Sequence, residues 1–146
     1  MNNLDSFFME TALEHSKKSL PDCEPNPPVG CVIVLDNKII AKGFTQKPGQ
    51  AHAEVNALEE IKDKTILEQA TIYVTLEPCS FQGRTPSCAK TLSKLRPKEV
   101  VVGMIDPDSR NNGKGIKILN DAGIPTRVGI LENKIRNFIS PFLNKS

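Results

Sequence analysis

The sequence has no tryptophan and only one tyrosine, and aromatic residues make up 5% of its 146 residues. Aromatic side chains are the platforms on which single-stranded nucleic acids stack their bases, so this scarcity argues against a nucleic-acid partner. An excess of one charge is also missing, because 19 lysines and arginines stand against 17 aspartates and glutamates. Such a balance creates no basic field for a polyanion. One basic stretch remains, which we interpret as a solvated helix face: Lys90, Lys94, Arg96 and Lys98.

A long apolar run is missing as well. The longest run in the first half of the chain, from Val29 to Leu35, includes Gly30 and falls far short of the roughly 20 residues that cross a bilayer. The first ten residues carry Asp5 and Glu10 and no basic leader before an apolar core, which is not typical of a secretory signal. The sequence therefore predicts no membrane association and a cytoplasmic location. There, the four cysteines are more typical of metal ligands, reactive thiols or core residues than of disulfides.

What the sequence contains fits one compact domain. Hydrophobic residues make up 38% and charged residues 25%, and 11 prolines and 9 glycines are spread along the chain. A chain of this length has room for one ordinary hydrophobic core. No repeat, low-complexity tract or linker divides the sequence. We expect residues 1–146 to form a single domain.

Hydrophobic spacing and turn residues predict alternating helices and strands. The expected helices cover residues 4–20, 50–62, 87–95 and 113–122, with a weakly helical tail at 132–142, and the expected strands cover 29–35, 38–44, 71–76, 99–104 and 124–130. In the second half, strands alternate with helices, which implies right-handed crossovers and a sheet that is covered on both faces. The predicted fold class is α/β, a three-layer α/β/α sandwich around a mixed five-stranded sheet.

Three short segments carry residues that could do chemistry: His52-Ala53-Glu54, Pro78-Cys79 and Cys88. One imidazole and two thiolates form a ligand set that zinc accepts, and three protein ligands leave the fourth tetrahedral position for a water molecule. A His-x-Glu followed by Pro-Cys and a second cysteine is the signature of zinc deaminases of nucleobases, in which the glutamate is an acid and base. Here the segment between the two cysteines runs from Ser80 to Ser87 and is longer than the usual two residues.

His52 and Glu54 can serve one site only at the start of a helix. On a continuous helix their side chains would point about 200° apart. If the backbone at His52 is not yet helical, both side chains can reach a point above the helix N-terminus, where the helix dipole favours negative charge. We therefore predict that His52, Cys79 and Cys88 bind Zn²⁺ and that Glu54 transfers protons in a hydrolysis that releases ammonia from an amidine-like ring carbon.

The remaining cysteines illustrate the ordinary role of this residue type. Cys31 lies inside an apolar strand and is expected to be a buried thiol, whereas Cys23 lies in a proline-rich loop and could be incidental. Neither is needed for zinc. A zinc-binding module without catalytic activity is an alternative, but structural zinc would not require a glutamate beside His52.

Five segments together resemble the deaminase domain of the bifunctional riboflavin-biosynthesis deaminase/reductase (RibD type), which belongs to the cytidine-deaminase-like zinc deaminases. These segments are residues 26–34, 51–58, 73–80, 83–88 and 103–107. The resemblance runs from the first helix to about Ile130. Its most specific part is Gly-Arg-Thr-Pro-x-Cys, which accounts for the long spacing between the two cysteines.

The resemblance implies a cytidine-deaminase-like fold. It also implies deamination of 2,5-diamino-6-ribosylamino-4(3H)-pyrimidinone 5′-phosphate, a phosphorylated small molecule, to the corresponding aminouracil. Asn26 would contact the pyrimidine, and Arg84 and Asp106 would line the ribosyl phosphate side. Backbone N–H groups of Gly113-Lys114-Gly115 form a weaker candidate anion site. A homo-oligomer is expected, and since no reductase domain is recognised here, a separate reductase polypeptide is a possible partner.

The sequence departs from the family at four places. Thr45 stands where the family commonly has histidine, and Phe81-Gln82 replaces a histidine followed by histidine or tyrosine. Asp108 stands where asparagine is common, and Ser109-Arg110 differs as well. Three of these places are expected near the substrate pocket. A relative that acts on a different aminopyrimidine, nucleoside or purine-like compound is therefore the alternative.

Overall fold

The structure is a computed structural model that describes residues 3–83 and 85–143. In chain order the elements are α1 (Asn3–Ser16), β1 (Gly30–Leu35), β2 (Lys38–Phe44), α2 (Ala53–Leu58), β3 (Thr71–Leu76), α3 (Cys88–Leu95), β4 (Glu99–Met104), α4 (Lys114–Asp121), β5 (Thr126–Val128) and α5 (Glu132–Ile139), with 3₁₀ turns at Lys17–Ser19, Lys64–Gln69 and Ser140–Phe142. Within the described residues, no helix has the length and apolarity needed to span a membrane.

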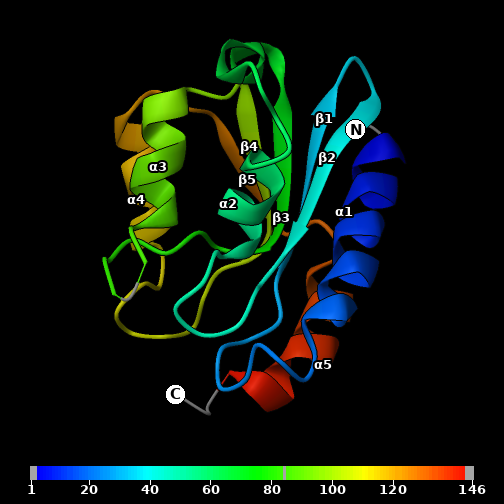
Figure 1. Ribbon diagram of the computed structural model, residues 1–146, viewed down its shortest axis with the longest axis vertical. Coiled ribbons are helices and arrows are strands. Elements are labelled where there is room, and N and C mark those ends of the chain that lie inside the picture. Colours follow the sequence, from blue (N-terminus) through cyan, green and yellow to red (C-terminus); the bar gives the residue numbers. More distant parts are fainter. Residues whose placement is uncertain (1–2, 84, 144–146) are drawn as a thin grey trace.

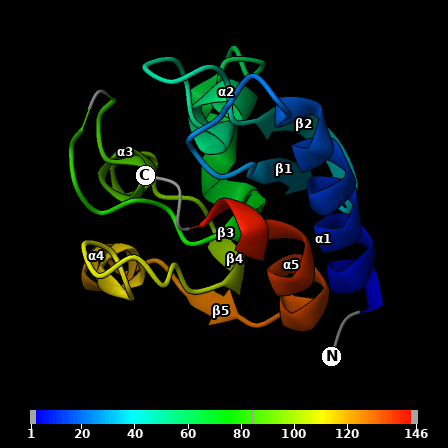
Figure 2. The same cartoon turned by 90° about the horizontal axis from the view of Figure 1, so that it is seen from below.

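The five strands form one mixed sheet in the order β2-β1-β3-β4-β5. Strand β1 is antiparallel to both β2 and β3, whereas β3, β4 and β5 are parallel to one another. Helices α1 and α5 cover one face, and α2, α3 and α4 cover the other (Figures 1 and 2). The predicted three-layer sandwich is thus confirmed.

Each face of the sheet has its own hydrophobic core. Along β4, Val100 and Val102 pack on the side of α2, α3 and α4, while Val101 packs on the side of α1 and α5. This alternation follows from the period of two along a strand, and strands buried on both faces read as continuous apolar runs. The run Val100 to Val102 is therefore apolar without interruption.

Local sequence explains the hairpin and one helix end. Asp36 and Asn37 join β1 to β2 with φ angles of 51° and 62°, the pair of positive values that a type I′ hairpin turn requires. Gly123 follows α4 with a φ of 84°, the left-handed conformation in which glycine commonly ends a helix.

Three predicted elements are longer than the observed ones. The first helix ends at Ser16 and continues as a 3₁₀ turn instead of running to residue 20. The second spans only Ala53–Leu58, because the backbone N–H groups of Glu60 and Ile61 then donate to carbonyls three residues back instead of four. The last strand is limited to Thr126–Val128, since Pro125 has no N–H to donate and Gly129 has a φ of 110°.

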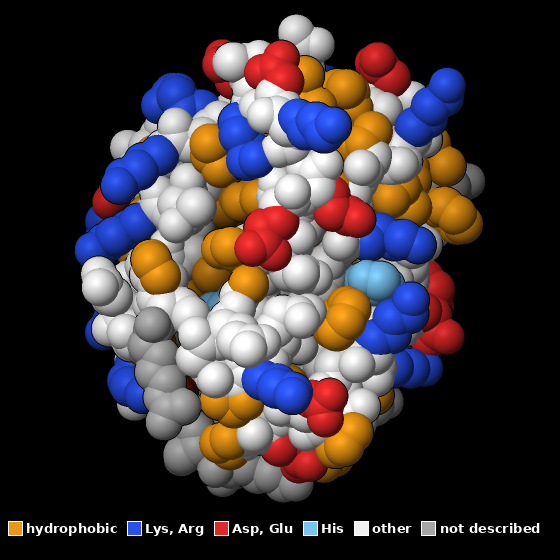
Figure 3. Space-filling model, viewed as in Figure 1, with side chains coloured by type: hydrophobic (Ala, Val, Ile, Leu, Met, Phe, Trp, Pro, Cys, Tyr) orange, Lys and Arg blue, Asp and Glu red, His pale blue; other side chains and the backbone are white. Residues whose placement is uncertain are grey.

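The charged surface agrees with the balanced composition. Figure 3 shows basic side chains standing out from the side of the molecule where α3 lies, with acidic side chains elsewhere on the same face. The four basic residues between 90 and 98 are all exposed. This exposure agrees with the interpretation of the stretch as a solvated face, which stays a prediction.

Candidate active site

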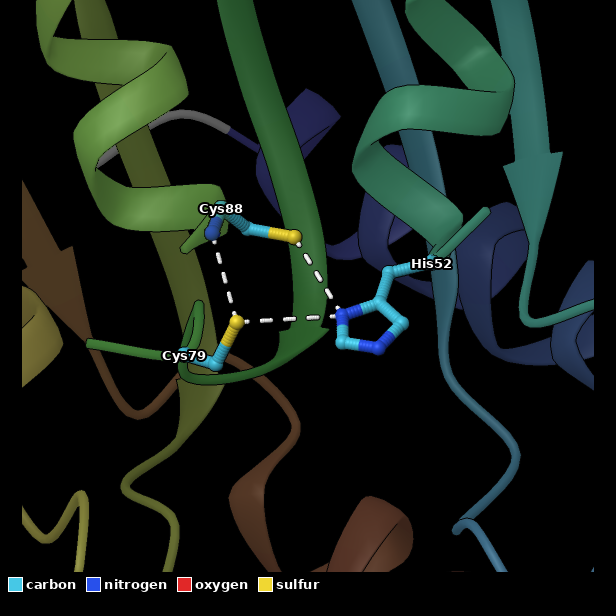
Figure 4. A group of neighbouring side chains, drawn as sticks. All are labelled: His52, Cys79 and Cys88. Carbon is cyan, nitrogen blue, oxygen red and sulfur yellow. Dashed lines mark hydrogen bonds between the residues drawn. The ribbon is translucent and has the colours of Figure 1, made fainter. Parts of the chain in front are cut away.

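The three candidate metal ligands come from the ends of three different elements. His52 is the N-cap of α2, with the extended backbone angles φ −73° and ψ 169°, so it precedes the first helical residue, as predicted. Cys79 follows the end of β3, and Cys88 is the first residue of α3. Figure 4 shows the imidazole pointing toward the two sulfur atoms. Two helix starts and one strand end thus meet at one point.

The distances within this group fit a tetrahedral zinc ion. The Nδ1 atom of His52 lies 3.7 Å from the Sγ atom of Cys79 and 3.4 Å from that of Cys88, and the three ligand atoms lie within 4.8 Å of one another. A Zn–S bond of about 2.3 Å and a Zn–N bond of about 2.05 Å at the tetrahedral angle would separate nitrogen from sulfur by about 3.6 Å. The donor set and its spacing therefore suit zinc.

Hydrogen bonds prepare these side chains for a cation. The backbone N–H of Cys88 donates to the sulfur of Cys79 over 3.2 Å. The hydrogen bonds from the side chains of Cys88 and His52 lower the pKa of the Cys79 thiol to about 4. On the far side of the imidazole, Nε2 lies 3.1 Å from the hydroxyl of Thr85. When Nδ1 binds a metal ion, the ring hydrogen is on Nε2, which then donates to the hydroxyl of Thr85, and Thr85 orients the ring.

Glu54 lies on the first turn of α2, close in sequence to the ligand His52. Its side chain is only 4% exposed. Burial, and then the charge of Cys79, raise the pKa of its carboxyl group to about 7. A carboxyl group with such a pKa can both accept and donate a proton at neutral pH.

A single cavity of about 310 Å³ brings most of the predicted site together. Its lining includes His52, Glu54 and Cys79, and also Asn26 and Asp106 from distant parts of the chain. Asn26 is half-buried, and burial raises the pKa of Asp106. The last predicted substrate contact, Arg84, lies outside the described residues. Cys31 and Cys23 are both fully buried and do not belong to the ligand group.

Each of the four departures from the resembled family has a residue that lines this cavity: Thr45, Phe81, Asp108 and Arg110. Thr45 is 4% exposed, and its hydroxyl accepts a hydrogen bond from the backbone N–H of Val29 over 3.1 Å. The backbone N–H of Thr45 in turn donates to the Val29 carbonyl. Thr45 therefore holds the segment that follows Asn26. Phe81 lines the cavity from the loop between the two cysteines.

The expected anion site at Gly113-Lys114-Gly115 is wrong, because the protein's own carboxylate occupies it. Glu77 Oε1 accepts from the backbone N–H of Gly113, and Oε2 accepts from that of Ile116. The buried Asn111 side chain accepts from the N–H of Gly115. Sequence reasoning missed Glu77 and Asn111. A signal for Glu77 was present, since it is a lone charge at the end of the apolar strand that leads to Cys79.

The sheet order and the ligand group at two helix starts define a cytidine-deaminase-like zinc protein. A family model for the zinc-binding region of cytidine and deoxycytidylate deaminases matches residues 2–104. The chain belongs to this family. Its cofactor is zinc, for which His52, Cys79 and Cys88 form the suitable group.

Individual relatives carry more specific names. The chloroplastic riboflavin biosynthesis protein PYRD of Zea mays is 43% identical over 97% of this chain and 36% of its own length. The diaminohydroxyphosphoribosylamino-pyrimidine deaminase of Buchnera aphidicola subsp. Schizaphis graminum is 36% identical over 97% of this chain and 95% of its own length. The solved structure of RibD from Acinetobacter baumannii has a TM-score of 0.89 and 45% identity over 96% of this chain and 39% of that one. The chain thus spans about a third of the length of the first curated relatives that it matches.

Proposed function

We propose that the protein is a zinc-dependent hydrolase that deaminates 2,5-diamino-6-ribosylamino-4(3H)-pyrimidinone 5′-phosphate to the aminouracil in riboflavin biosynthesis. The observation that carries this proposal is the buried Glu54 carboxyl group in one cavity with His52 and Cys79. The Buchnera relative, of which the chain covers 95%, is named for this pyrimidine deaminase activity. That name supports the choice of substrate.

The reaction replaces an exocyclic amino group by oxygen and releases ammonia. In this proposal His52, Cys79 and Cys88 hold zinc, which when bound supplies a Lewis acid that makes water nucleophilic near neutral pH. Glu54 accepts one proton from the attacking water and passes it to the neighbouring ring nitrogen. It then transfers the second proton from the new hydroxyl group to the leaving amino group, so that ammonia departs and a carbonyl remains.

The substrate contacts form the less direct part of the proposal. The side-chain amide of Asn26 offers both a donor and an acceptor to the edge of a pyrimidine. Asp106 lines the same cavity, where its carboxylate can accept hydrogen bonds from ribose hydroxyl groups. Arg84 would contact the phosphate, as the family resemblance implies.

Thr45 and Phe81 are the reason for proposing an alternative substrate. Both line the cavity at places where the resembled family commonly has histidine. If they retune specificity, the enzyme would act on a different aminopyrimidine, nucleoside or purine-like compound. A panel of such compounds tested beside the riboflavin intermediate separates the two proposals, because a strong preference for the intermediate removes the second.

The decisive variant is Glu54→Gln, measured by zinc content and ammonia release. We expect the wild type to bind one zinc ion per chain and to lose turnover when zinc is chelated. Glu54→Gln should keep the zinc and lose turnover by about 10²–10⁴-fold. The exposed Glu14 provides a matched control, and Glu14→Gln should behave as the wild type. Wild-type turnover in Glu54→Gln, or purified protein that binds no zinc, would refute the mechanism.

The domain organisation and the location of the protein are also proposals. We propose that residues 1–146 act as one deaminase domain, as the length of the Buchnera relative supports. A cytosolic location is supported by four free cysteines. The homo-oligomer and the separate reductase polypeptide stay predictions.

A further inference from the structure

Two loops meet at the mouth of the cavity. One loop follows β3 and carries Phe81, and the other follows β4 and carries Arg110; both residues line the cavity. The guanidinium carbon of Arg110 lies 4.8 Å from the centre of the Phe81 ring. This distance is within the range in which an aromatic ring attracts a cation through its π face. Phe81 therefore fixes one face of the guanidinium group.

Asp108 fixes one edge of the same group. The Nε of Arg110 donates to Oδ1 of Asp108 over 3.1 Å, and Nη2 donates to Oδ2 over 2.6 Å. The backbone N–H of Arg110 also donates to Oδ1, over 2.9 Å. The hydroxyl of Ser80 reaches the Arg110 carbonyl at 3.4 Å and thereby links the two loops. The guanidinium group is thus held in one orientation before any ligand binds.

The guanidinium group of Arg110 has N–H donors that Asp108 does not use. Four of its five N–H bonds form two paired edges, and Asp108 uses the edge made of Nε and Nη2. The other edge, made of Nη1 and the second hydrogen of Nη2, has no hydrogen-bond acceptor among the residues that the structure describes. Two parallel N–H groups match two oxygens of a phosphate or a carboxylate.

The free edge of Arg110 is a positive group in a cavity that acidic side chains also line. Among the described residues that line the cavity, Arg110 is the only arginine or lysine, while acidic side chains line the remainder: Glu54, Glu77, Asp106 and Asp108. The Arg110 side chain is 60% exposed, whereas Glu54 is only 4% exposed. A ligand with an apolar or neutral ring inside and an anionic group at the solvated mouth would match this gradient.

Arg110 contacts both Phe81 and Asp108. The three side chains therefore form one physical unit beside the cavity.

We propose that Arg110 binds the 5′-phosphate of the substrate through its free edge and so selects phosphorylated over unphosphorylated pyrimidines. Asp108 and Phe81 are positioning residues that hold the guanidinium group. This inference rests on the proposed function and deepens it, because it names a residue that determines specificity for the phosphorylated substrate. Preorganisation by the two neighbours lowers the entropy that Arg110 loses on binding.

The test compares Arg110→Gln with the wild type on the phosphorylated substrate and on the same compound without its phosphate. We expect KM for the phosphorylated substrate to rise about 10–100-fold, as loss of charge-assisted hydrogen bonds implies, with kcat within about threefold. KM for the unphosphorylated compound should not change. Asp108→Asn and Phe81→Leu should give intermediate increases in KM. Arg136→Gln, at an exposed arginine on α5, is the matched control and should leave both KM values unchanged.

A binding measurement separates this inference from the proposed function. Calorimetry with ribose 5-phosphate and with ribose tests the phosphate contact even if no pyrimidine is turned over. We expect the wild type to bind ribose 5-phosphate more tightly than ribose, and Arg110→Gln to lose that preference. If Arg110→Gln keeps the wild-type preference in KM or in binding, or if the wild type has no preference, the inference is wrong. Failure of turnover with a preserved, Arg110-dependent preference would refute only the proposed substrate.

Discussion

The carboxylate of Glu77 accepts a hydrogen bond from the backbone N–H of Gly113, 2.9 Å from its Oε1. The same oxygen accepts from the N–H of Asp106 over 3.1 Å, and Oε2 accepts from Ile116 over 3.0 Å. Gly113 is the N-cap of α4 and has no side chain with which to cap the helix. Glu77 supplies the missing acceptors from another element, and its charge suits the positive end of the helix dipole. The segment before Cys79 is thereby tied to the loop that carries Asp106.

Glu77→Gln should destabilise the protein although it hardly changes the size of the side chain. The amide has one oxygen for three N–H donors, so its NH₂ group would face at least one of them and leave that donor unsatisfied. We expect a loss of about 1–3 kcal/mol in the free energy of unfolding, measured by urea denaturation. Glu68→Gln, at an exposed position, is the control. Equal unfolding midpoints for Glu77→Gln and the wild type would show that these three hydrogen bonds do not hold the loop.

Thr85→Val should weaken zinc binding without removing a ligand. The variant removes the hydroxyl that lies 3.1 Å from Nε2 of His52, so the imidazole loses the partner that orients Nδ1 toward the sulfurs. Partners of this kind contribute about 10–100-fold to metal affinity. Competition with a chelator measures the change, and Thr85→Ser should restore the affinity. Zinc affinity in Thr85→Val equal to that of the wild type would exclude the orienting role.

The strands were predictable because their signal is local. Residues 38–44, 71–76 and 99–104 were predicted as strands with the observed bounds, since apolar and β-branched runs end there at turn residues or charges. The end of α2 was not predictable in the same way. It depends on the N–H groups of Glu60 and Ile61 donating to carbonyls three residues back instead of four, and the period of hydrophobic residues does not report that change of partner.

The residues of the site differ in the same way: some were predictable from local sequence and others were not. His52, Glu54, Cys79 and Cys88 lie in short motifs whose chemistry is recognisable before folding. Glu77, in contrast, acts on Gly113, which lies 36 positions further along the chain. No spacing rule links these two positions, because the contact exists only once β3 and β4 pair in parallel. The supporting residues therefore emerge only from the tertiary structure.

Asp5 should make stability depend on pH at the acidic end. This carboxylate is 2% exposed, and the hydrogen bond from Arg127 lowers its pKa below the ordinary value. Its contribution is present above about pH 4, the ordinary aspartate pKa, and is lost as the pH falls through the lower pKa of the folded state. Asp5→Asn should cost about 1–2 kcal/mol at pH 7, a low value for charged hydrogen bonds because the Arg127 guanidinium is partly solvated.

Unfolding in urea at pH 7 and at pH 3 tests this assignment. The difference in unfolding free energy between the wild type and Asp5→Asn should shrink at the lower pH, because the Asp5 carboxyl group then takes up a proton more readily in the unfolded chain than in the folded one, where Arg127 opposes protonation. Glu14→Gln serves as the control, since Glu14 pairs with Lys17 at an exposed position, where ion pairs contribute little to stability. If the Asp5→Asn difference is the same at both pH values, the aspartate stabilises α1 through its shape and neutral hydrogen bonds, not through its charge.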